Sequence, residues 1–400
     1  MKPSFGQTLT GGFQDMKVSR PIMPRRVVVA RGGAIPSSSG LGRAHSDMIN
    51  SLSNGDIENY QLSKVIEHDF RGNGLLRLWR RWYSHPSRVT KFCKSGKAAI
   101  LHISDQEQAG LVPKNSPIPV VVTVHDLFHL DPQIVETPEG PITVGNTSPG
   151  LIRKRDIGKI RKGLSRANLL ICDSETTKEH AQRLFPKVHS VTVPLGLDVE
   201  LRDPRKNPMP RPDCLPTSKV NLLVIGSEEP RKRLRFVIDV IASLPDEIRS
   251  EIILHKVGAE SNSSARKELE SHSVNSGVEM NWLGSLDELD LIAIEQHADA
   301  LLFPSVAEGF GYPPLEAMAA GCPVLMSDLG SHNELGIPEF ILPPFDKKAW
   351  VAALREMHDD WLTNGKVPRE INQDALDRAI QFSSKVFSNN LKITYDTQFS

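Results

Sequence analysis

Short apolar runs recur along the chain, and each of them ends in a polar or glycine-rich stretch. The first run, Val27–Ala30 in RRVVVA, is rich in β-branched residues and leads into RGGAIPSSSGLGR and an amphipathic segment. A strand that feeds a loop and then a helix is the opening of a βα unit. The other runs predicted as strands are residues 98–104, 119–126, 168–174, 190–196, 220–226, 251–258, 278–284, 298–304 and 323–328.

Helix-like stretches separate most of these runs, and this alternation predicts parallel sheets covered on both faces. The alternation is interrupted once, where residues 201–219 hold five prolines, many charges and no periodicity. Such a stretch is typical of an inter-domain linker. We therefore expect an α/β chain with two doubly wound domains and a ligand cleft between them, at the carboxyl ends of the strands. The expected parts are a flexible tail (1–24), an N-terminal domain (25–200), a linker (201–218), a C-terminal domain (219–375) and a last helix (376–400) that is a candidate to pack back on the N-terminal domain.

The amino-acid composition argues against some classes of protein. Lys+Arg and Asp+Glu both total 48, and this balance argues against a dedicated nucleic-acid binder. The four cysteines are far apart and form no C-x-x-C pair, which favours a reducing, cytoplasmic location. No apolar run approaches the roughly 18 residues of a spanning helix, and the N-terminus lacks the apolar core of a secretory signal.

The stretch EGFGYPPLEAMAAGCPVLMSD, which starts at Glu308, carries the most specific chemistry. Glu308 lies in a loop after a predicted strand, and Glu316 lies in the first turn of the helix that follows. Gly309 and Gly311 leave backbone amides open to close approach, and a helix N-terminus is an anion site. An anion site beside carboxylates that can accept from hydroxyl pairs predicts a nucleotide sugar. The alternative is that Glu316 only complements the helix dipole and that Glu308 is solvated.

This stretch resembles the E-x7-E signature of the retaining glycosyltransferases of family 4, which have the GT-B architecture of two facing Rossmann-like domains. Further stretches resemble the same family in order and spacing. They are SGLGRAHSDMINSL, TVHDLFHL, LLICDSETTKEHAQRLF, VPLGLDV, VIGSEEPRKRL and WLGSLDELDLI. Together they cover about residues 27–335.

The resemblance implies roles for residues of the E-x7-E stretch. Glu308 would hold hydroxyls of the donor sugar, and Glu316 would accept from the ribose diol. Backbone amides at Gly309, Phe310 and Gly311 would meet the sugar or the phosphate.

The resemblance implies further roles outside that stretch. Arg231 and Lys232 would supply positive charge to the diphosphate. Many members have an arginine where this chain has Ser227, and we assign that role to Arg231. Gly42 would lie where the first loop touches the phosphates, and the ring or backbone of His125 is a candidate to stabilise the transition state.

No cofactor and no metal ion are expected, since the donor is a substrate and the chain has no D-x-D motif. His125 and His129 stand four residues apart, but no third metal ligand is evident. The predicted reaction is metal-independent transfer of a hexose, such as mannose or glucose, from a nucleotide-diphosphate donor to a hydroxyl of a glycan or lipid-linked acceptor, with retention of configuration. The rival readings are a nucleotide-sugar-binding protein without turnover and a GT-B epimerase.

Two segments bear on the acceptor. The run 153–166 has seven positive charges and one negative, with Ile157, Ile160 and Leu164 on one side. It is a candidate for peripheral contact with anionic lipid, and a solvated helix face is the alternative. The aromatic residues of WRRWY (79–83) either stack on an acceptor sugar or pack in the core, and packing is favoured.

Overall fold

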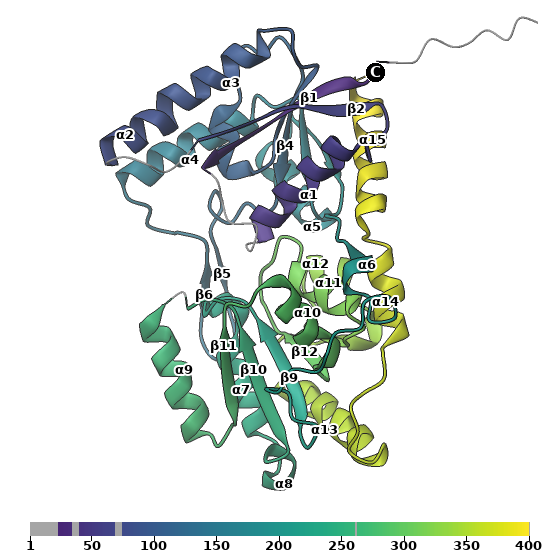
Figure 1. The fold of residues 1–400 in the computed structure, drawn as a ribbon. Coiled ribbons are helices and arrows are strands. Elements are labelled where there is room, and N and C mark those ends of the chain that lie inside the picture. Colours follow the sequence, from purple (N-terminus) through teal and green to yellow (C-terminus); the bar gives the residue numbers. More distant parts are fainter. Residues whose placement is uncertain (1–22, 34–39, 69–73, 261, 400) are drawn as a thin grey trace, which may run out of the picture.

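The computed structural model describes residues 23–33, 40–68, 74–260 and 262–399, and these form two α/β domains with one six-stranded sheet each (Figure 1). Every neighbouring strand pair within these two sheets is parallel. The fold class predicted from the sequence is therefore confirmed. The predicted tail, apart from residues 23 and 24, lies outside the described residues.

The N-terminal sheet has the strand order β2-β1-β3-β4-β7-β8. Its strands are β1 (Arg25–Gly33), β2 (Tyr60–His68), β3 (Ile100–Ile103), β4 (Val120–Val124), β7 (Leu169–Cys172) and β8 (His189–Thr192). The helical segments of this part of the chain are α1 (Gly40–Asn54), α2 (Gly74–Trp79), η1 (Arg80–Ser84), α3 (His85–Cys93), η2 (Gln106–Leu111), α4 (Leu151–Leu164), α5 (Glu175–Leu184) and α6 (Val199–Arg202).

The C-terminal sheet has the order β11-β10-β9-β12-β13-β14. Its strands are β9 (Val220–Ile225), β10 (Ile252–Val257), β11 (Met280–Gly284), β12 (Ala300–Phe303), β13 (Val324–Ser327) and β14 (Ile341–Leu342). The helical segments are η3 (Pro230–Lys232), α7 (Leu234–Ala242), α8 (Asp246–Arg249), α9 (Ser263–Asn275), α10 (Glu288–His297), α11 (Tyr312–Ala319), α12 (Ser331–Leu335), η4 (Pro338–Phe340), α13 (Lys347–Thr363), α14 (Gln373–Ile380) and α15 (Ser384–Phe399).

Each sheet is buried on both faces because successive residues of a strand point to opposite sides. In β1, Val28 packs with Leu164 of α4 in one apolar cluster, whereas Val27 and Val29 pack with Leu52 of α1 in another. The second sheet divides in the same way between two clusters. This double burial explains why the strands are nearly continuous apolar runs in the sequence.

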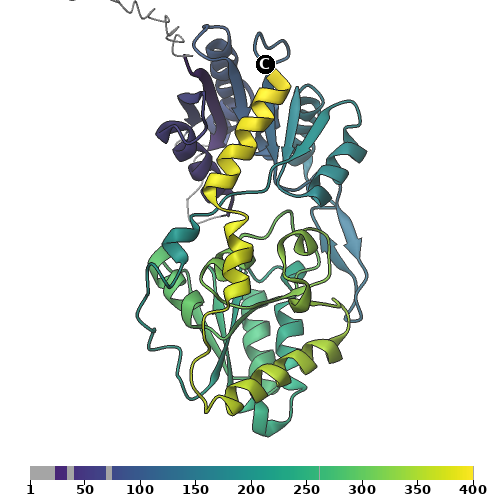
Figure 2. The same ribbon diagram turned by 90° about the vertical axis from the view of Figure 1, so that its right-hand side faces the viewer.

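The chain crosses between the domains twice, at neighbouring points. Val193 still belongs to a core cluster of the first domain, whereas Leu195 and Leu197 pack in the second. The return crossing pairs with the first one, since the Leu197 amide donates to the Phe382 carbonyl at 2.9 Å and the Ser384 amide donates to Leu197 at 2.9 Å. Helix α15 then lies along the N-terminal domain (Figures 1 and 2).

The proline-rich stretch 201–218 lies against the C-terminal domain. The Met209 amide donates to Gln296 of α10 at 2.8 Å, and Leu215 is part of the core cluster that contains α11. This irregular segment is therefore packed rather than free, and the crossing itself falls at about residues 193–197, just before it.

A small antiparallel hairpin, β5 (Gln133–Val135) with β6 (Ile142–Val144), reaches from the N-terminal domain toward the other (Figure 1). At its turn, Glu139 pairs with Arg233 at 3.0 Å. The hairpin is thus a second contact between the domains, on the opposite side from the two crossings.

Candidate functional site

Glu308 lies in the loop between β12 and α11, and two cations of the same domain hold it. Its carboxylate contacts Lys232 Nζ at 2.5 Å and Arg231 Nη1 at 3.0 Å. Burial on its own would raise the pKa of Glu308, but the charges of Lys232 and Arg231 outweigh it and lower that pKa to about 2. The three residues form a charged cluster although Glu308 and Lys232 are 76 positions apart, and Arg231 also pairs with Glu229 at 2.7 Å.

The loop after β9 contains the sequence PRKR (230–233), and its three cationic side chains point in two different directions. Arg231 also donates to the Ala307 carbonyl at 3.0 Å, so it is fixed along the Glu308 loop. Arg233 takes a left-handed conformation with φ of 52°, stacks on Phe236 at 3.9 Å and points to the β5–β6 hairpin. Arg231 and Lys232, but not Arg233, are thus placed to meet an anion beside Glu308.

Glu316 is the fifth residue of α11, so it lies one turn beyond the helix start rather than in the predicted first turn, and it is buried between two arginines. Arg43, from the start of α1 in the other domain, pairs with its carboxylate, and Arg202 of α6 contacts it at 3.2 Å. Arg202 also contacts Glu295 at 2.7 Å and Glu288 at 3.3 Å. This ion network connects Arg43 of the N-terminal domain with Glu316 of the C-terminal domain, and Arg202 joins it from the segment after the first crossing.

Sequence reasoning missed Arg202 and Glu295. Arg202 falls in the stretch assigned to the linker, where a charged residue is expected to be solvated. Glu295 is completely buried, and this burial, partly offset by Arg202, raises its pKa to about 7. The one signal in the sequence was an acidic residue inside the apolar run LIAIEQ.

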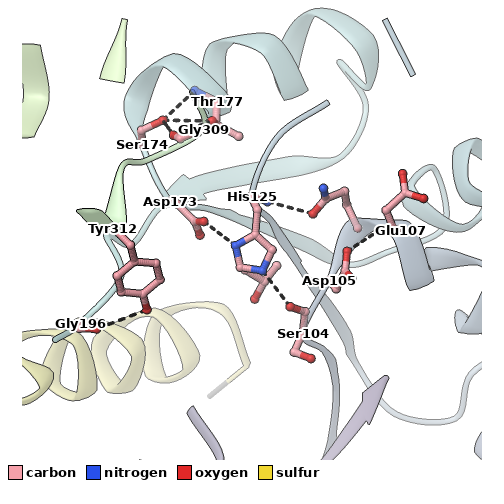
Figure 3. Close-up of polar contacts among 12 residues, drawn as sticks. Ser104, Asp105, Glu107, His125, Asp173, Ser174, Thr177, Gly196, Gly309 and Tyr312 are labelled. Atoms are coloured by element: carbon pink, nitrogen blue, oxygen red, sulfur yellow. Dashed lines mark hydrogen bonds and ion pairs between the residues drawn. The ribbon is translucent and has the colours of Figure 1, made fainter. Parts of the chain in front are cut away.

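The two glycines of GFGY have different roles, and Gly309 lies where the two domains touch. A side chain at Gly309 would collide with the backbone carbonyl of His125, and the Gly309 carbonyl accepts from Ser174 Oγ at 2.7 Å and from Thr177 Oγ1 at 3.2 Å (Figure 3). Gly311 has φ of 116° and precedes the first residue of α11. Only glycine fits the close approach at 309, and glycine suits the left-handed backbone at 311.

Phe310 and Gly42 are both buried in the protein. The Phe310 side chain is buried with the rings of Tyr312 and Phe382, so any donor contact at this position would come from its backbone, as expected. Gly42 is buried in the first turn of α1, next to Arg43. The residues between β1 and α1, 34–39 with the sequence AIPSSS, lie outside the described residues.

His125 follows β4, and its ring is enclosed in the N-terminal domain. Nδ1 lies 2.5 Å from Asp173 Oδ2, and Nε2 lies 3.0 Å from the Ser104 carbonyl (Figure 3). Because both nitrogens face acceptors, the ring is held in its doubly protonated form. Burial disfavours that charge, but Asp173, Asp105 and the Ser104 carbonyl outweigh burial and raise the pKa of His125 to about 9. The backbone carbonyl, rather than the ring, is the part of His125 that faces the Glu308 loop.

This arrangement predicts how stability depends on pH. A histidine whose pKa is higher in the folded state stabilises the fold fully below its unfolded value of about 6.5, and the contribution is lost as pH rises through about 9. Asp173→Asn should therefore cost on the order of 3 kcal/mol at about pH 6 and much less at about pH 10. Denaturant unfolding of both proteins across this range measures the difference. A cost that does not change with pH would show that the pair is not charged.

A cavity of about 410 Å³ opens between the domains beside the charged cluster. Residues Asp126, Phe128, Thr176 and His180 line it from the N-terminal domain. Residues Glu308, Ser331 and His332 line it from the C-terminal domain. Its lining is both polar and apolar, it reaches Glu308, and it has room for a sugar ring.

Among the described residues, no three His, Cys, Asp or Glu side chains form a group that could hold a metal ion. The positive charge in the site comes from Arg231 and Lys232. The chemistry available here is the binding of an anion together with hydroxyl groups.

The basic run 153–166 forms most of α4, and its apolar side faces the protein. Ile160 and Leu164 are buried in a core cluster, and Ile157 packs against the same cluster. The expectation that these three residues face lipid is therefore wrong, because they fix α4 to the sheet. Among the described residues, no helix is long and apolar enough to cross a membrane.

The expectation for WRRWY is also wrong in part. Trp82 is half-buried and donates to Asp156 of α4 at 2.7 Å, but Trp79 and Tyr83 are exposed. Packing therefore accounts for one of the three aromatic side chains only.

Comparison with known proteins gives two family matches. A model described as Glycosyltransferase Family 4 matches residues 48–201, and one described as Glycosyl transferases group 1 matches residues 211–377. The two matched ranges correspond to the two domains.

Similar curated proteins include the serotype-specific mannosyltransferase WbdA of Escherichia coli, 31% identical over 166 residues, which are 40% of this chain and 20% of that relative. The O-antigen chain mannosyltransferase B of Escherichia coli is 30% identical over 50% of this chain and 54% of its own length. The glycogen synthase of Mycobacterium tuberculosis is 28% identical over 60% of this chain and 61% of its own length. The chain thus spans a fifth to about three fifths of the length of these relatives.

Solved structures share the fold along almost the whole chain. Sucrose-phosphate synthase from Thermosynechococcus elongatus has a TM-score of 0.71 at 16% identity and covers 94% of this chain and 99% of its own. The Anabaena protein HepE, in complex with UDP and glucose, has a TM-score of 0.68 at 16% identity, over 93% of this chain and 100% of its own.

Proposed function

The chain belongs to the glycosyltransferases of family 4, which have the GT-B fold, and from this we propose that it transfers a hexose from a nucleoside-diphosphate donor to a hydroxyl group of a glycan or a lipid-linked sugar. The observation that carries the proposal is the cluster of Glu308, Arg231 and Lys232, in which Glu308 lines the inter-domain cavity. A mannose donor is the first to test, because two of the relatives are named mannosyltransferases.

The cluster suits departure of a nucleoside diphosphate. Negative charge grows on the phosphate oxygen as its bond to the sugar breaks, and Arg231 and Lys232 are fixed charges that stabilise it. In the free protein the carboxylates of Glu308 and Glu229 together balance these cations. When the donor binds, the phosphates take over this balance, and the carboxylate of Glu308 becomes available to accept from sugar hydroxyls.

We propose that the acceptor attacks on the face that the diphosphate leaves. The bond between the acceptor oxygen and the anomeric carbon forms as the bond to the phosphate oxygen breaks, and the acceptor proton passes to that phosphate. This route retains the configuration and needs no carboxylate nucleophile.

Metal independence is part of the proposal. Arg231 and Lys232 supply two positive charges at the proposed place of the diphosphate, which is the role that a divalent ion would otherwise have there. Transfer should therefore continue unchanged when a chelator is added.

The experiment that tests donor binding is thermal unfolding with a panel of nucleotide sugars, without metal, for the wild type and Glu316→Gln. The panel holds GDP-mannose, UDP-glucose, UDP-GlcNAc, UDP-galactose and ADP-glucose. A ligand at about 100 times its Kd stabilises a protein by about 2.7 kcal/mol, so one donor should raise the Tm of the wild type. The variant keeps the shape of Glu316 but loses the charged acceptor, and the shift should shrink or vanish.

Turnover separates the proposal from its rivals. A transferase consumes the donor at a rate that rises with acceptor, whereas an epimerase alters the donor without one. A binding protein without turnover would show the Tm shift and leave the donor intact. No shift with any donor, and no turnover with acceptor present, would contradict the proposal.

A further inference from the structure

Arg233, which directly follows the two cations of the site, combines a strained backbone with a buried charge. It takes the left-handed conformation with φ of 52°, which is uncommon for a residue other than glycine. The residue is only 4% exposed. Such a conformation persists where the surrounding contacts hold it, and positions of this kind cluster at functional sites. The contacts of Arg233 therefore bear on where its chain neighbours, Arg231 and Lys232, are placed.

Both domains hold the Arg233 guanidinium. Within its own domain it lies over the rings of Phe236 at 3.9 Å and Phe345 at 5.5 Å, and it donates to the Pro344 carbonyl. From the N-terminal domain, the carboxylate of Glu139 contacts it at 3.0 Å. Burial lowers the pKa of Arg233, and the charge of Glu139 opposes that effect. Within the described residues, Glu139 is the only carboxylate paired with this buried cation.

The β5–β6 hairpin that carries Glu139 has its base at the wall of the inter-domain cavity. Gln133 of β5 lines this cavity. Gly145, just after β6, has φ of 91°, and a side chain there would collide with the carbonyl of Phe128, which also belongs to the cavity wall. Val144 is buried in the N-terminal domain. The hairpin therefore connects the cavity wall of one domain to Arg233 of the other (Figure 1).

The hairpin and the C-terminal domain are joined at the hairpin turn rather than along the whole hairpin. A second cavity, of about 360 Å³, lies between them and is lined by Ile142 of β6, Phe236 of α7 and Leu269 of α9. Among the described residues, the Glu139–Arg233 pair is the one hydrogen-bonded ion pair that links the hairpin to this domain. The position of the hairpin turn thus depends on this pair.

The loop that carries the cations is also fixed from the side of Glu308. The Val306 amide donates to the Arg231 carbonyl at 2.9 Å, and the Arg231 side chain donates to the Ala307 carbonyl at 3.0 Å. Residues 231–233 therefore have the Glu308 loop at one end and the hairpin of the other domain at the other end.

We propose that the Glu139–Arg233 ion pair positions Arg231 and Lys232 for the diphosphate when the two domains are together. Neither Glu139 nor Arg233 lines the inter-domain cavity, so both are positioning residues. The inference rests on the function proposed above. A loop fixed at both ends keeps its cations where negative charge develops, and such preorganised groups need no rearrangement during the reaction. With the hairpin released, one end of the loop would be free.

Steady-state kinetics of the full chain tests this role. Glu139→Lys places a cation against Arg233, and it should lower kcat about tenfold, since a misplacement of about 1 Å can cost up to about 10²-fold. KM for the donor should change less than about threefold, because the charge on the diphosphate is greatest in the transition state. Glu139→Gln should lower kcat about two- to fivefold, as expected for a partly exposed pair. The Glu139 side chain is 40% exposed, so both variants should keep the Tm of the wild type.

Glu136→Lys is the matched control. Glu136 is an exposed carboxylate of the same hairpin, three residues before Glu139, and it has no ion-pair partner among the described residues. The control makes the same change of charge, and it should keep kcat within about twofold, the usual effect of an exposed substitution.

Hydrogen exchange tests the ion pair without any turnover. The amides of Lys232 and Arg233 donate to the carbonyls of Glu229 and Pro230 at 2.9 Å and 3.0 Å. Exchange of these amides reports local opening of the loop, so Glu139→Lys should accelerate it about tenfold. Glu136→Lys should exchange like the wild type.

Four results would overturn the proposal. With an active wild type, these are an unchanged kcat in Glu139→Lys, an equal loss of kcat in Glu136→Lys, or a loss confined to KM, which would show that the hairpin affects donor binding alone. The fourth is equal amide exchange in the wild type and Glu139→Lys. A wild type that turns over no donor would contradict the proposed function instead, and the exchange measurement would still decide whether the ion pair fixes the loop.

Discussion

Lys232→Met should lower kcat/KM for sugar transfer by about 10²- to 10³-fold, the usual cost of removing one preorganised group that stabilises developing negative charge. Lys232 is half of the positive charge next to Glu308, and its ammonium lies 2.5 Å from that carboxylate. The charge on the diphosphate is greatest in the transition state. The loss should therefore appear mainly in kcat and less in KM.

Steady-state kinetics with a saturating acceptor measures this effect. Arg235→Met is a suitable control because Arg235 is an exposed cation only three residues away, whose partner is Glu268 at 3.2 Å. It should keep activity within about twofold, as surface pairs contribute little. A Lys232→Met enzyme with nearly normal kcat would show that the lysine is a partner for Glu308 and nothing more.

Arg202→Met should lower the free energy of unfolding by about 3–5 kcal/mol, because it breaks a buried ion network from one side. Arg202 is fully buried and contacts Glu295 at 2.7 Å and Glu316 at 3.2 Å. Without the guanidinium, Glu295 would be a buried carboxylate with no compensating charge at that contact. Glu316 would keep Arg43 alone, so donor affinity should fall as well.

The pH dependence of this variant has a definite sign. The pKa of Glu295 is raised to about 7 even with Arg202 present, so its proton is bound more tightly in the folded state. That contribution to stability is complete below the unfolded pKa of about 4.3 and is lost as pH rises through the folded pKa. Removal of Arg202 raises the folded pKa further. The variant should therefore be closer to the wild type at about pH 5 than at about pH 8.

Denaturant unfolding with two companion variants makes this test specific. Arg205→Met removes an exposed arginine three positions away, paired with Asp203 at 2.7 Å, and should cost less than about 1 kcal/mol. Arg202→Met combined with Glu295→Met replaces the buried pair with apolar side chains and should recover much of the loss. Equal losses for Arg202→Met and Arg205→Met would contradict the buried-network account.

The sequence predicted most of the fold because the evidence for it is local. All ten apolar runs overlap a strand of the structure, as the run at 298–304 does with β12. A parallel strand that is buried on both faces must be apolar along its length, so it is visible without knowledge of its neighbours. Strand β2 was missed because it lies at the edge of its sheet and its sequence YQLSKVIEH is largely polar.

The E-x7-E stretch likewise predicted that Glu308 lies in a loop and Glu316 in the helix that follows, although Glu316 lies one turn further from the helix start than predicted. Loop glycines, the prolines of the first turn and the terminal Gly321 are local signals. The close contact between the Glu308 loop and the Arg231–Lys232 loop was implied by family resemblance, and the structure brings them together.

The tertiary structure alone decided which charged groups meet across long distances in the chain. Arg202 reaches Glu316 across 114 positions, and His125 reaches Asp173 across 48. Such pairs depend on the strand order and on how the two domains pack together. The periodicity of the sequence contains no information about the strand order or the domain packing. The same holds for the helices: whether a helix turns its apolar side chains inward or outward depends on what packs against it, so Ile160 is buried and Leu75 is exposed. The sequence thus determined the elements and the local chemistry, and packing decided the partners.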